Sequence, residues 1–295
     1  MDYTDGKTLL NILKPKKGDP PPFGAIPFDE IIFDRLKSSP DVTTSPDPKV
    51  LVLCGPPGCG KSTIKMSILS QISVEKYINI DPDEIRTILM SLGVRFSDDK
   101  TMAGITNAFN KRMSDQAQIQ RLNIVFDTTG QNFRAVSDLI NGSKVKGYKS
   151  YFTVIWASVE TCVRRVSSRN QHLIDSGSGR IQMPEEIVQG IYDNFLKGTA
   201  SNLLLDYPVR ADEVFLYNNN ADGVEPQLLY HKVETDGIEG TDFPGFYNMN
   251  LTAVSPFITK IEKEGGRRRN KKTKRRNIKT KKRETKRRNK KTKKR

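Results

Sequence analysis

Eight residues, GPPGCGKS at positions 55–62, have the types and spacing of a loop that holds phosphate groups. Its glycines allow the backbone to curl so that N–H groups face phosphate oxygens, and the helix expected after it adds positive dipole. Lys61 is predicted to reach the β- and γ-phosphates of ATP, and Ser62 to bind Mg²⁺. A glycine-rich turn without a ligand is the alternative, and the apolar VLVLC directly before the loop argues against it. The residues expected to contact ATP are Gly55, Pro56, Pro57, Gly58, Cys59, Gly60, Lys61, Ser62 and Thr63.

A second acidic element follows in NIVFDTTG, residues 123–130, where an apolar run ends in Asp127. An acid at this position can hold Mg²⁺ directly or through water; the alternative is a strand-end aspartate that makes a turn. Many ATPases place Glu directly after this Asp to activate water, but Thr128 and Thr129 follow here, so dedicated ATP hydrolysis is disfavoured. The segment NNNAD (218–222) lacks the lysine of the N-K-x-D motif that recognises guanine, so a GTP-binding protein is not indicated. Among proteins with such a phosphate loop, this leaves the small kinases.

Three carboxylates and an arginine lie close together in INIDPDEIR, residues 78–86. Asp81 fits a helix N-cap, Pro82 suits the first helical position and Glu84 completes a capping box. Asp83 and Arg86 are left without a structural role, one turn apart. The carboxyl ends of parallel strands line the ligand crevice, so Asp83 is expected to face the same crevice as the phosphate loop.

A phosphate loop combined with D-x-D-x-x-R after the second strand is similar to the zeta-toxin-like kinases and to the kinase domain of phage-type polynucleotide 5′-kinases. The resemblance covers roughly residues 48–205. It implies that Asp83 is the base that accepts the proton of the acceptor hydroxyl, and that Arg86 beside it positions the substrate. A charge that only favours the start of a helix is the alternative for Asp83.

A further arginine-rich segment, VETCVRRVSSRNQ at 159–171, places Arg165 and Arg169 four residues apart on one helical face. DSGSGRIQMPEE then supplies a Gly/Ser turn, Arg180 and a helix that starts at proline. In the kinases that this chain resembles, the corresponding region is a lid that closes over the nucleotide. The resemblance therefore implies a catalytic role for Arg165 and Arg169 and an ATP contact for Arg180. The run GRIQMP approximates the G-R-x-x-P pattern of that group with one extra residue, and a solvated basic helix is the alternative.

Alternating apolar runs and helical patterns must position these residues, and they predict a three-layer α/β fold of the P-loop kinase type with a mostly parallel sheet. Strands are expected at 49–55, 77–80, 123–127, 150–157 and 212–218, with an edge strand in LLYHKV. Helices are expected near 62–72, 83–92, 102–121, 131–141, 158–170 and 185–204. In the last of these, Ile187, Ile191 and Phe195 recur at the spacing of one buried face. Residues 1–47 look like a largely irregular arm with at most one short helix, and the kinase domain is expected to span 48–265.

The net charge of +15 is concentrated in the last 29 residues, 267–295, which contain 20 Lys or Arg and a single acid. The rest of the chain is mildly acidic. This tail lacks the apolar residues of a core and is predicted to be disordered from residue 266 onward. It suits non-specific binding to nucleic-acid phosphates or a nuclear-import signal; a solubilising extension is the alternative. Its composition resembles tails in proteins of large DNA viruses.

Three cysteines without a C-x-x-C pair and two histidines argue against a disulfide framework or a zinc site. With no long apolar run and no signal-peptide pattern, the chain is expected to be soluble and intracellular, in the cytoplasm or the nucleus, without a membrane partner.

These features predict an ATP-dependent kinase with Mg²⁺ as cofactor and a hydroxyl-bearing acceptor. The resemblance makes a nucleotide sugar such as UDP-N-acetylglucosamine one candidate and a polynucleotide 5′-hydroxyl another. The chain without its tail is mildly acidic, which disfavours the polynucleotide because a groove that binds a nucleic-acid strand should be basic. The rival from another class is a nucleic-acid-associated, ATP-binding protein that acts through its tail.

Overall fold

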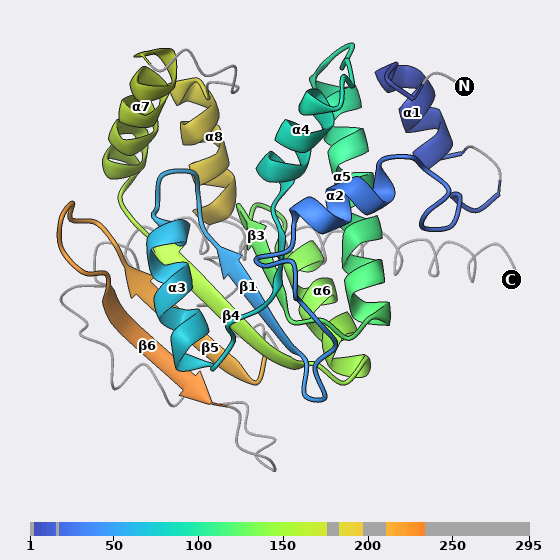
Figure 1. Ribbon diagram of the computed structural model, residues 1–295. Coiled ribbons are helices and arrows are strands. Elements are labelled where there is room, and N and C mark those ends of the chain that lie inside the picture. Colours follow the sequence, from blue (N-terminus) through green and yellow to red (C-terminus); the bar gives the residue numbers. More distant parts are fainter. Residues whose placement is uncertain (1–2, 16–17, 176–182, 197–210, 234–295) are drawn as a thin grey trace, which may run out of the picture.

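A six-stranded sheet in the order β2-β3-β1-β4-β5-β6 forms the centre of the structure (Figure 1), a computed structural model that describes residues 3–15, 18–175, 183–196 and 211–233. The first five strands of this order are parallel and β6 pairs antiparallel with β5. β1 and β4 are nearly continuous apolar runs, as expected for central parallel strands covered on both faces. The strands are β1 (Lys49–Cys54), β2 (Ile78–Ile80), β3 (Ile124–Thr128), β4 (Lys149–Trp156), β5 (Glu213–Asn218) and β6 (Gln227–Val233).

Helices cover both faces of the sheet, which confirms the predicted three-layer α/β class. α3 lies in front of the sheet in Figure 1, and right-handed connections place α5 and α6 on the opposite face. The helices are α1 (Gly6–Leu13), α2 (Asp29–Arg35), α3 (Lys61–Gln71), α4 (Pro82–Ser91), α5 (Asp99–Ile119), α6 (Phe133–Val145), α7 (Val159–Asp175) and α8 (Glu185–Phe195). The expected strands and helices of the body are present within a few residues, including the edge strand.

The strand order creates a crevice beside β1. After β1 the chain moves to the β2 side of the sheet, whereas β3 and β4 lie on either side of β1. Ligands of open parallel sheets bind at such a switch point, outside the carboxyl ends of the strands. In the register of β1 and β3, Leu53 is level with Asp127, so the aspartate lies next to the start of the phosphate loop.

The N-terminal residues differ from the expected irregular arm. Two helices form there instead of at most one, and side chains such as Leu9 and Ile32 are fully buried in the common core. Asp29, also fully buried, pairs with Arg112 of α5 and accepts the backbone N–H of Gly24 at 2.9 Å. Helices of seven or eight residues have weak local signals, and it is packing against α5 that stabilises them here.

Of the three residues predicted to form the buried face of α8, Phe195 is buried, Ile191 is partly buried and Ile187 is exposed. Val188, Tyr192 and Phe195 are buried, whereas Ile187 is 52% exposed. Tyr192 can be buried because its hydroxyl accepts a hydrogen bond from the Trp156 indole at 3.1 Å, so a residue with a polar group joins the core. The end of this expected helix, at 197–204, lies outside the described residues.

Among the described residues, no helix is long and apolar enough to cross a membrane. The end of the expected kinase domain, residues 234–265, and the whole basic tail lie outside the described part of the chain.

Candidate active site

A cavity of about 1400 Å³ opens at the carboxyl ends of the central strands. The phosphate loop and the start of α4 line one end of it, and α5, α6 and α7 contribute the other walls. Figure 1 shows α4 and α5 on one side of this region and α7 and α8 on the other. The fold therefore brings the separate motifs of the sequence to a single site.

The phosphate loop packs tightly against α7 and the segment after β5. Gly58 and Gly60 have φ angles of +80° and +91°, and a Cβ on Gly60 would lie 1.9 Å from the side-chain nitrogen of Asn219. A Cβ on Gly58 would lie 2.4 Å from the carbonyl oxygen of Cys162. Both positions thus require glycine for conformation and for space.

Not every predicted ATP contact lies on the cavity wall. Of the residues predicted to contact ATP, five line the cavity: Pro57, Gly58, Gly60, Lys61 and Ser62. Gly55, Pro56 and Cys59 are buried, and Thr63 lines a smaller neighbouring cavity of about 420 Å³. The buried residues shape the loop from behind.

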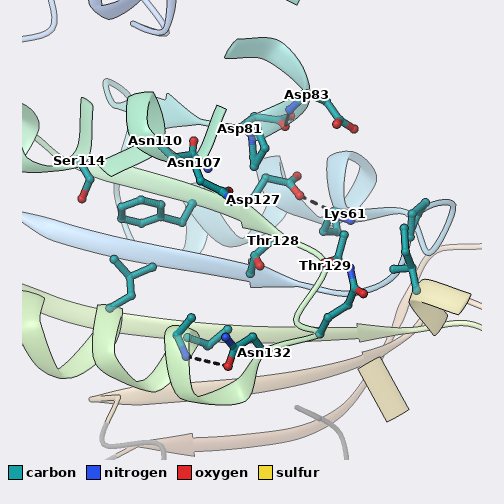
Figure 2. Close-up of a pocket in the computed structure, with 18 of the residues that line it drawn as sticks. Lys61, Asp81, Asp83, Asn107, Asn110, Ser114, Asp127, Thr128, Thr129 and Asn132 are labelled. Atoms are coloured by element: carbon teal, nitrogen blue, oxygen red, sulfur yellow. Dashed lines mark hydrogen bonds and ion pairs between the residues drawn. The ribbon is translucent and has the colours of Figure 1, made fainter. Parts of the chain in front are cut away.

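Lys61 and Asp127 form the charged centre of the site, with 3.5 Å between Nζ and Oδ1 (Figure 2). The Lys61 ammonium also donates to the carbonyl oxygen of Gly55 at 2.8 Å. Burial lowers the pKa of Lys61, but the negative charges around it, chiefly Asp127, outweigh burial and raise this pKa overall. Lys61 is therefore a permanent cation. Burial raises the pKa of Asp127, and Lys61 opposes this effect only in part.

Asp81 belongs to this site as well, which the sequence did not reveal. Its carboxylate caps α4 by accepting the backbone N–H of Asp83 at 2.8 Å, as predicted. It also lines the cavity, and burial together with the charge of Asp127 raises its pKa to about 6. Asp81, directly after β2, thus caps α4 and also belongs to the group of charged residues in the cavity.

The oxygen donors in the cavity fit a magnesium ion. Ser62 and Asp127, the predicted ligands, both line it. Burial raises the pKa values of Asp81 and Asp127, and a divalent cation nearby would offset that effect. Within the described residues no group of three or more His, Cys, Asp or Glu could hold a metal unaided. Mg²⁺ is commonly bound through one or two protein ligands together with water and substrate phosphates.

Asp83 and Arg86 form an ion pair at the start of α4, with 3.1 Å between Oδ1 and Nη2. Both residues line the cavity. Asp83 is 63% exposed, and Figure 2 shows it on the same side of the site as Asp81, Asp127 and Lys61. The Arg86 Nε atom is buried and has no hydrogen-bond partner in the described part of the chain. A side chain with an unused donor, next to an accessible carboxylate, is suited to contact a substrate.

The predicted lid arginines separate into different environments. Arg169 lines the cavity and is exposed. Arg165 also borders the cavity, but its guanidinium pairs with Asp222 at 2.6 Å and donates to the carbonyl oxygen of Gly58 at 3.2 Å. Arg180 lies outside the described residues. The contact to Asp222, 57 residues further along the chain, could not be read from the helical spacing of the arginines.

With this geometry established, comparison with known proteins identifies the family. The zeta toxin family model matches residues 34–222, more than half of the chain. The chain belongs to the zeta toxin family. This confirms the resemblance inferred from the phosphate loop and the D-x-D-x-x-R pattern.

Similar solved structures share low sequence identity with this zeta toxin family member. A structure from the PezAT chromosomal toxin-antitoxin system of Streptococcus pneumoniae is 17% identical with a TM-score of 0.47, over 63% of this chain and 73% of that one. An AvrRxo1-ORF1:ORF2 structure with ATP is 16% identical with a TM-score of 0.47, over 63% of this chain and 59% of that one. The chain thus spans less than two thirds of the AvrRxo1 chain. No curated protein matches.

In this zeta toxin family member, the cavity continues from the phosphate loop as a groove between α5 and α6. Polar side chains of α5 form one wall, at the spacing of a single helical face: Asn107, Asn110, Ser114 and Gln118. The facing side of α6 is mostly small or apolar, with Ala135, Leu139 and Gly142. Figure 2 shows the first three α5 residues beside the groove, with Thr128, Thr129 and Asn132 across from them.

Proposed function

We propose that this chain is an ATP-dependent kinase that transfers the γ-phosphoryl group of ATP to a hydroxyl group of a small molecule. The observation that carries the proposal is the single cavity that contains both Lys61 of the phosphate loop and the Asp83–Arg86 pair. A phosphate-binding cation and an accessible carboxylate in one cavity supply a donor site and a base for the acceptor. Membership of the zeta toxin family supports the same reaction.

In this mechanism the loop N–H groups and Lys61 bind the phosphates of ATP. The acceptor oxygen forms a bond to the γ-phosphorus while the bond to the β–γ bridging oxygen breaks, and ADP leaves. Asp83 accepts the proton of the acceptor hydroxyl, and Arg86 orients the acceptor beside it. Ser62 and Asp127 would hold Mg²⁺, which would neutralise charge on the transferring group. Arg169 and Arg180 supply positive charge from the lid.

The α5–α6 groove favours an uncharged, hydroxyl-bearing part of the acceptor. Its cations are engaged: Lys111 pairs with Asp115, and Lys146 donates to Gln118. A groove that binds a nucleic-acid strand along its phosphate backbone requires unpaired positive charge along its length. The side-chain oxygen of Asn110 is buried without a hydrogen-bond partner in the described chain, as expected for a group that accepts from a ligand hydroxyl.

A nucleotide sugar fits this groove better than a polynucleotide end, because amides and hydroxyls are the usual partners of sugar hydroxyls. The 20 Lys and Arg residues of the C-terminal tail favour the second candidate function, a nucleic-acid-associated protein that binds ATP. Such a protein would act through the tail, whereas the proposed kinase acts through the cavity.

Purified protein with γ-phosphate-labelled ATP and Mg²⁺ tests the proposal. The acceptor panel contains UDP-sugars, free nucleosides and 5′-hydroxyl oligonucleotides. We expect label on a UDP-sugar or another small hydroxyl compound. Label on the oligonucleotides alone would support the polynucleotide alternative, and label only in free phosphate would contradict a kinase.

A further inference from the structure

The turn after β5, with the sequence NNNAD at 218–222, lies directly behind the phosphate loop. Asn219 is 5% exposed, and its side-chain amide donates a hydrogen bond to the carbonyl oxygen of Cys59 at 2.9 Å. Its own backbone is fixed on both sides: the N–H donates to the carbonyl of Trp156 at 2.8 Å, and the carbonyl accepts from Arg165 at 2.8 Å. A buried residue whose backbone is held by two hydrogen bonds is a rigid support for the side-chain amide that contacts the loop.

This contact determines the direction of the next N–H group in the loop. In a planar trans peptide the C=O and the N–H point in opposite directions. The Cys59 carbonyl points toward Asn219, so the N–H of Gly60 must point away from Asn219. Gly60 borders both cavities, whereas Asn219 lines only the smaller one, on the other side of the loop from the main cavity's phosphate-binding residues Lys61 and Ser62. The buried hydrogen bond behind the loop therefore aims the Gly60 N–H at the phosphate side.

The fit between the two residues leaves little freedom. A Cβ on Gly60 would lie 1.9 Å from the Asn219 amide nitrogen, so the loop backbone rests directly on this side chain. Arg165 supports the same arrangement by donating to the carbonyl of Gly58 and by pairing with Asp222. Asparagine suits the position because its amide donates without adding charge beside bound phosphate.

We propose that Asn219 is a positioning residue for the phosphate donor: it holds the Cys59–Gly60 peptide in the orientation that binds the ATP phosphates. Asn219 does not touch the reacting atoms and acts only through the loop. The inference rests on the proposed function, because it assumes that ATP is the ligand of the loop. Its effect is preorganisation, which removes the need to order the peptide when ATP binds.

Two substitutions of Asn219 test the proposal by direct measurement of ATP binding with calorimetry. Asn219→Ala removes the donor, and we expect the Kd for ATP to rise about tenfold, the size of effect that one lost hydrogen bond produces. Asn219→Asp keeps the shape but places a carboxylate against the Cys59 carbonyl, so the loss at neutral pH is expected to be larger. Should the aspartate variant fail to fold, as judged by its Tm, the alanine variant carries the test.

The aspartate variant also provides a rescue that loosened packing would not give. A protonated carboxyl has an O–H donor, so lowering the pH is expected to restore ATP affinity relative to the wild-type protein at the same pH. Asn220→Ala is the matched control, because it removes a hydrogen bond of the same turn, to the Ser158 N–H at 2.7 Å, and leaves the Cys59 contact intact. We expect its ATP affinity to stay close to that of the wild-type protein.

The outcomes separate the two proposals. Wild-type affinity in a folded Asn219→Ala protein, or an equal loss in Asn220→Ala, would overturn the role of Asn219 and leave the kinase proposal unaffected. A wild-type protein that binds ATP but transfers no phosphoryl group would overturn the kinase and leave the Asn219 test valid. A wild-type protein that does not bind ATP would overturn both.

Discussion

At the scale of single residues, Asp81 shows how one carboxylate can have two roles. As the N-cap of α4 it directs the helix that carries Asp83 and Arg86. As part of the cavity wall it lies in the field of Asp127, and burial and that charge raise its pKa to about 6 from an ordinary 3.8. Ionisation of Asp81 is therefore less favourable in the folded protein than in the unfolded protein, and it lowers the free energy of unfolding.

This pKa leads to a pH-dependent prediction for stability. The folded-state pKa is raised, so the contribution of Asp81 is fully present below pH 3.8 and is lost as the pH rises through 6. Asp81→Asn keeps an N-cap acceptor and removes the charge. Without Mg²⁺, we expect the variant to be more stable than the wild-type protein at pH 7.5, by at most about 3 kcal/mol, and equal to it near pH 4. Urea unfolding at several pH values measures this. Parallel pH profiles of the two proteins would contradict the assignment.

At the scale of elements, α5 and α6 form the groove that leads away from the phosphate loop. Gln118, which lines the groove on α5, donates a hydrogen bond to Ser143 of α6 at 3.3 Å. Gly142 faces the groove and is exposed, and a Cβ there would meet no atom within 4 Å. There is thus space for a Cβ at Gly142, and we expect a larger side chain there to narrow the groove.

Gly142→Leu is expected to raise the KM for the acceptor found in the labelling panel about tenfold or more, since loss of fit in a pocket of this kind costs about 1–3 kcal/mol. The Kd for ATP should not change, because the phosphate loop is untouched. Gly190→Leu is the matched control: Gly190 lies on α8, also has no atom within 4 Å of a Cβ, and does not line the cavity. Equal acceptor kinetics for the two variants would show that the groove does not bind the acceptor.

The elements were largely predictable from the sequence, whereas the contacts between them were not. Apolar runs and helical periodicity indicated the strands, the helices and the phosphate loop, because these signals are local. Asn219 contacts Cys59 across 160 residues, and Arg165 pairs with Asp222 across 57. No spacing rule connects such pairs. The sequence around Asn219 shows only that NNNAD lacks the lysine of a guanine-binding N-K-x-D motif.

At the scale of the whole molecule, the N-terminal segment shares the hydrophobic core of the α/β body. Arg112 of α5 donates through Nε to Asp29 at 2.8 Å and through Nη1 to the carbonyl of Pro21 at 2.6 Å. Asp29 is fully buried, so removing its partner would leave an uncompensated charge inside the protein. α5 is in turn a wall of the groove, so the Arg112 contacts connect the N-terminal segment to the helix that lines the groove.

Arg112→Met is accordingly expected to lower the free energy of unfolding by about 3–5 kcal/mol. Lys111→Met, the neighbouring position, breaks an exposed pair with Asp115 and should cost at most about 1 kcal/mol. Chemical unfolding of both variants at pH 7 measures the difference. Equal losses would show that the buried pair does not anchor the N-terminal segment.

The basic tail offers a prediction at the same scale. If the cavity carries the function, deleting residues 267–295 should leave the turnover of a small-molecule acceptor within about twofold, since the tail is expected to make only non-specific phosphate contacts. Binding to DNA or RNA should fall sharply, and the remaining binding should depend less on salt. Loss of turnover with the tail would instead favour a nucleic-acid-associated protein.

The most direct test of the central claim compares two aspartates in the first turns of two helices. Asp83 lines the cavity at the start of α4, whereas Asp99 is exposed at the start of α5 and lies outside the cavity. In single-turnover transfer from labelled ATP, we expect Asp83→Asn to slow the reaction by about 10²–10⁴, the usual size of a general-base contribution, while its ATP affinity stays close to that of the wild-type protein. Asp99→Asn should react like the wild-type protein. A full transfer rate in Asp83→Asn, or an equal loss in Asp99→Asn, would contradict the assignment of Asp83 as the base.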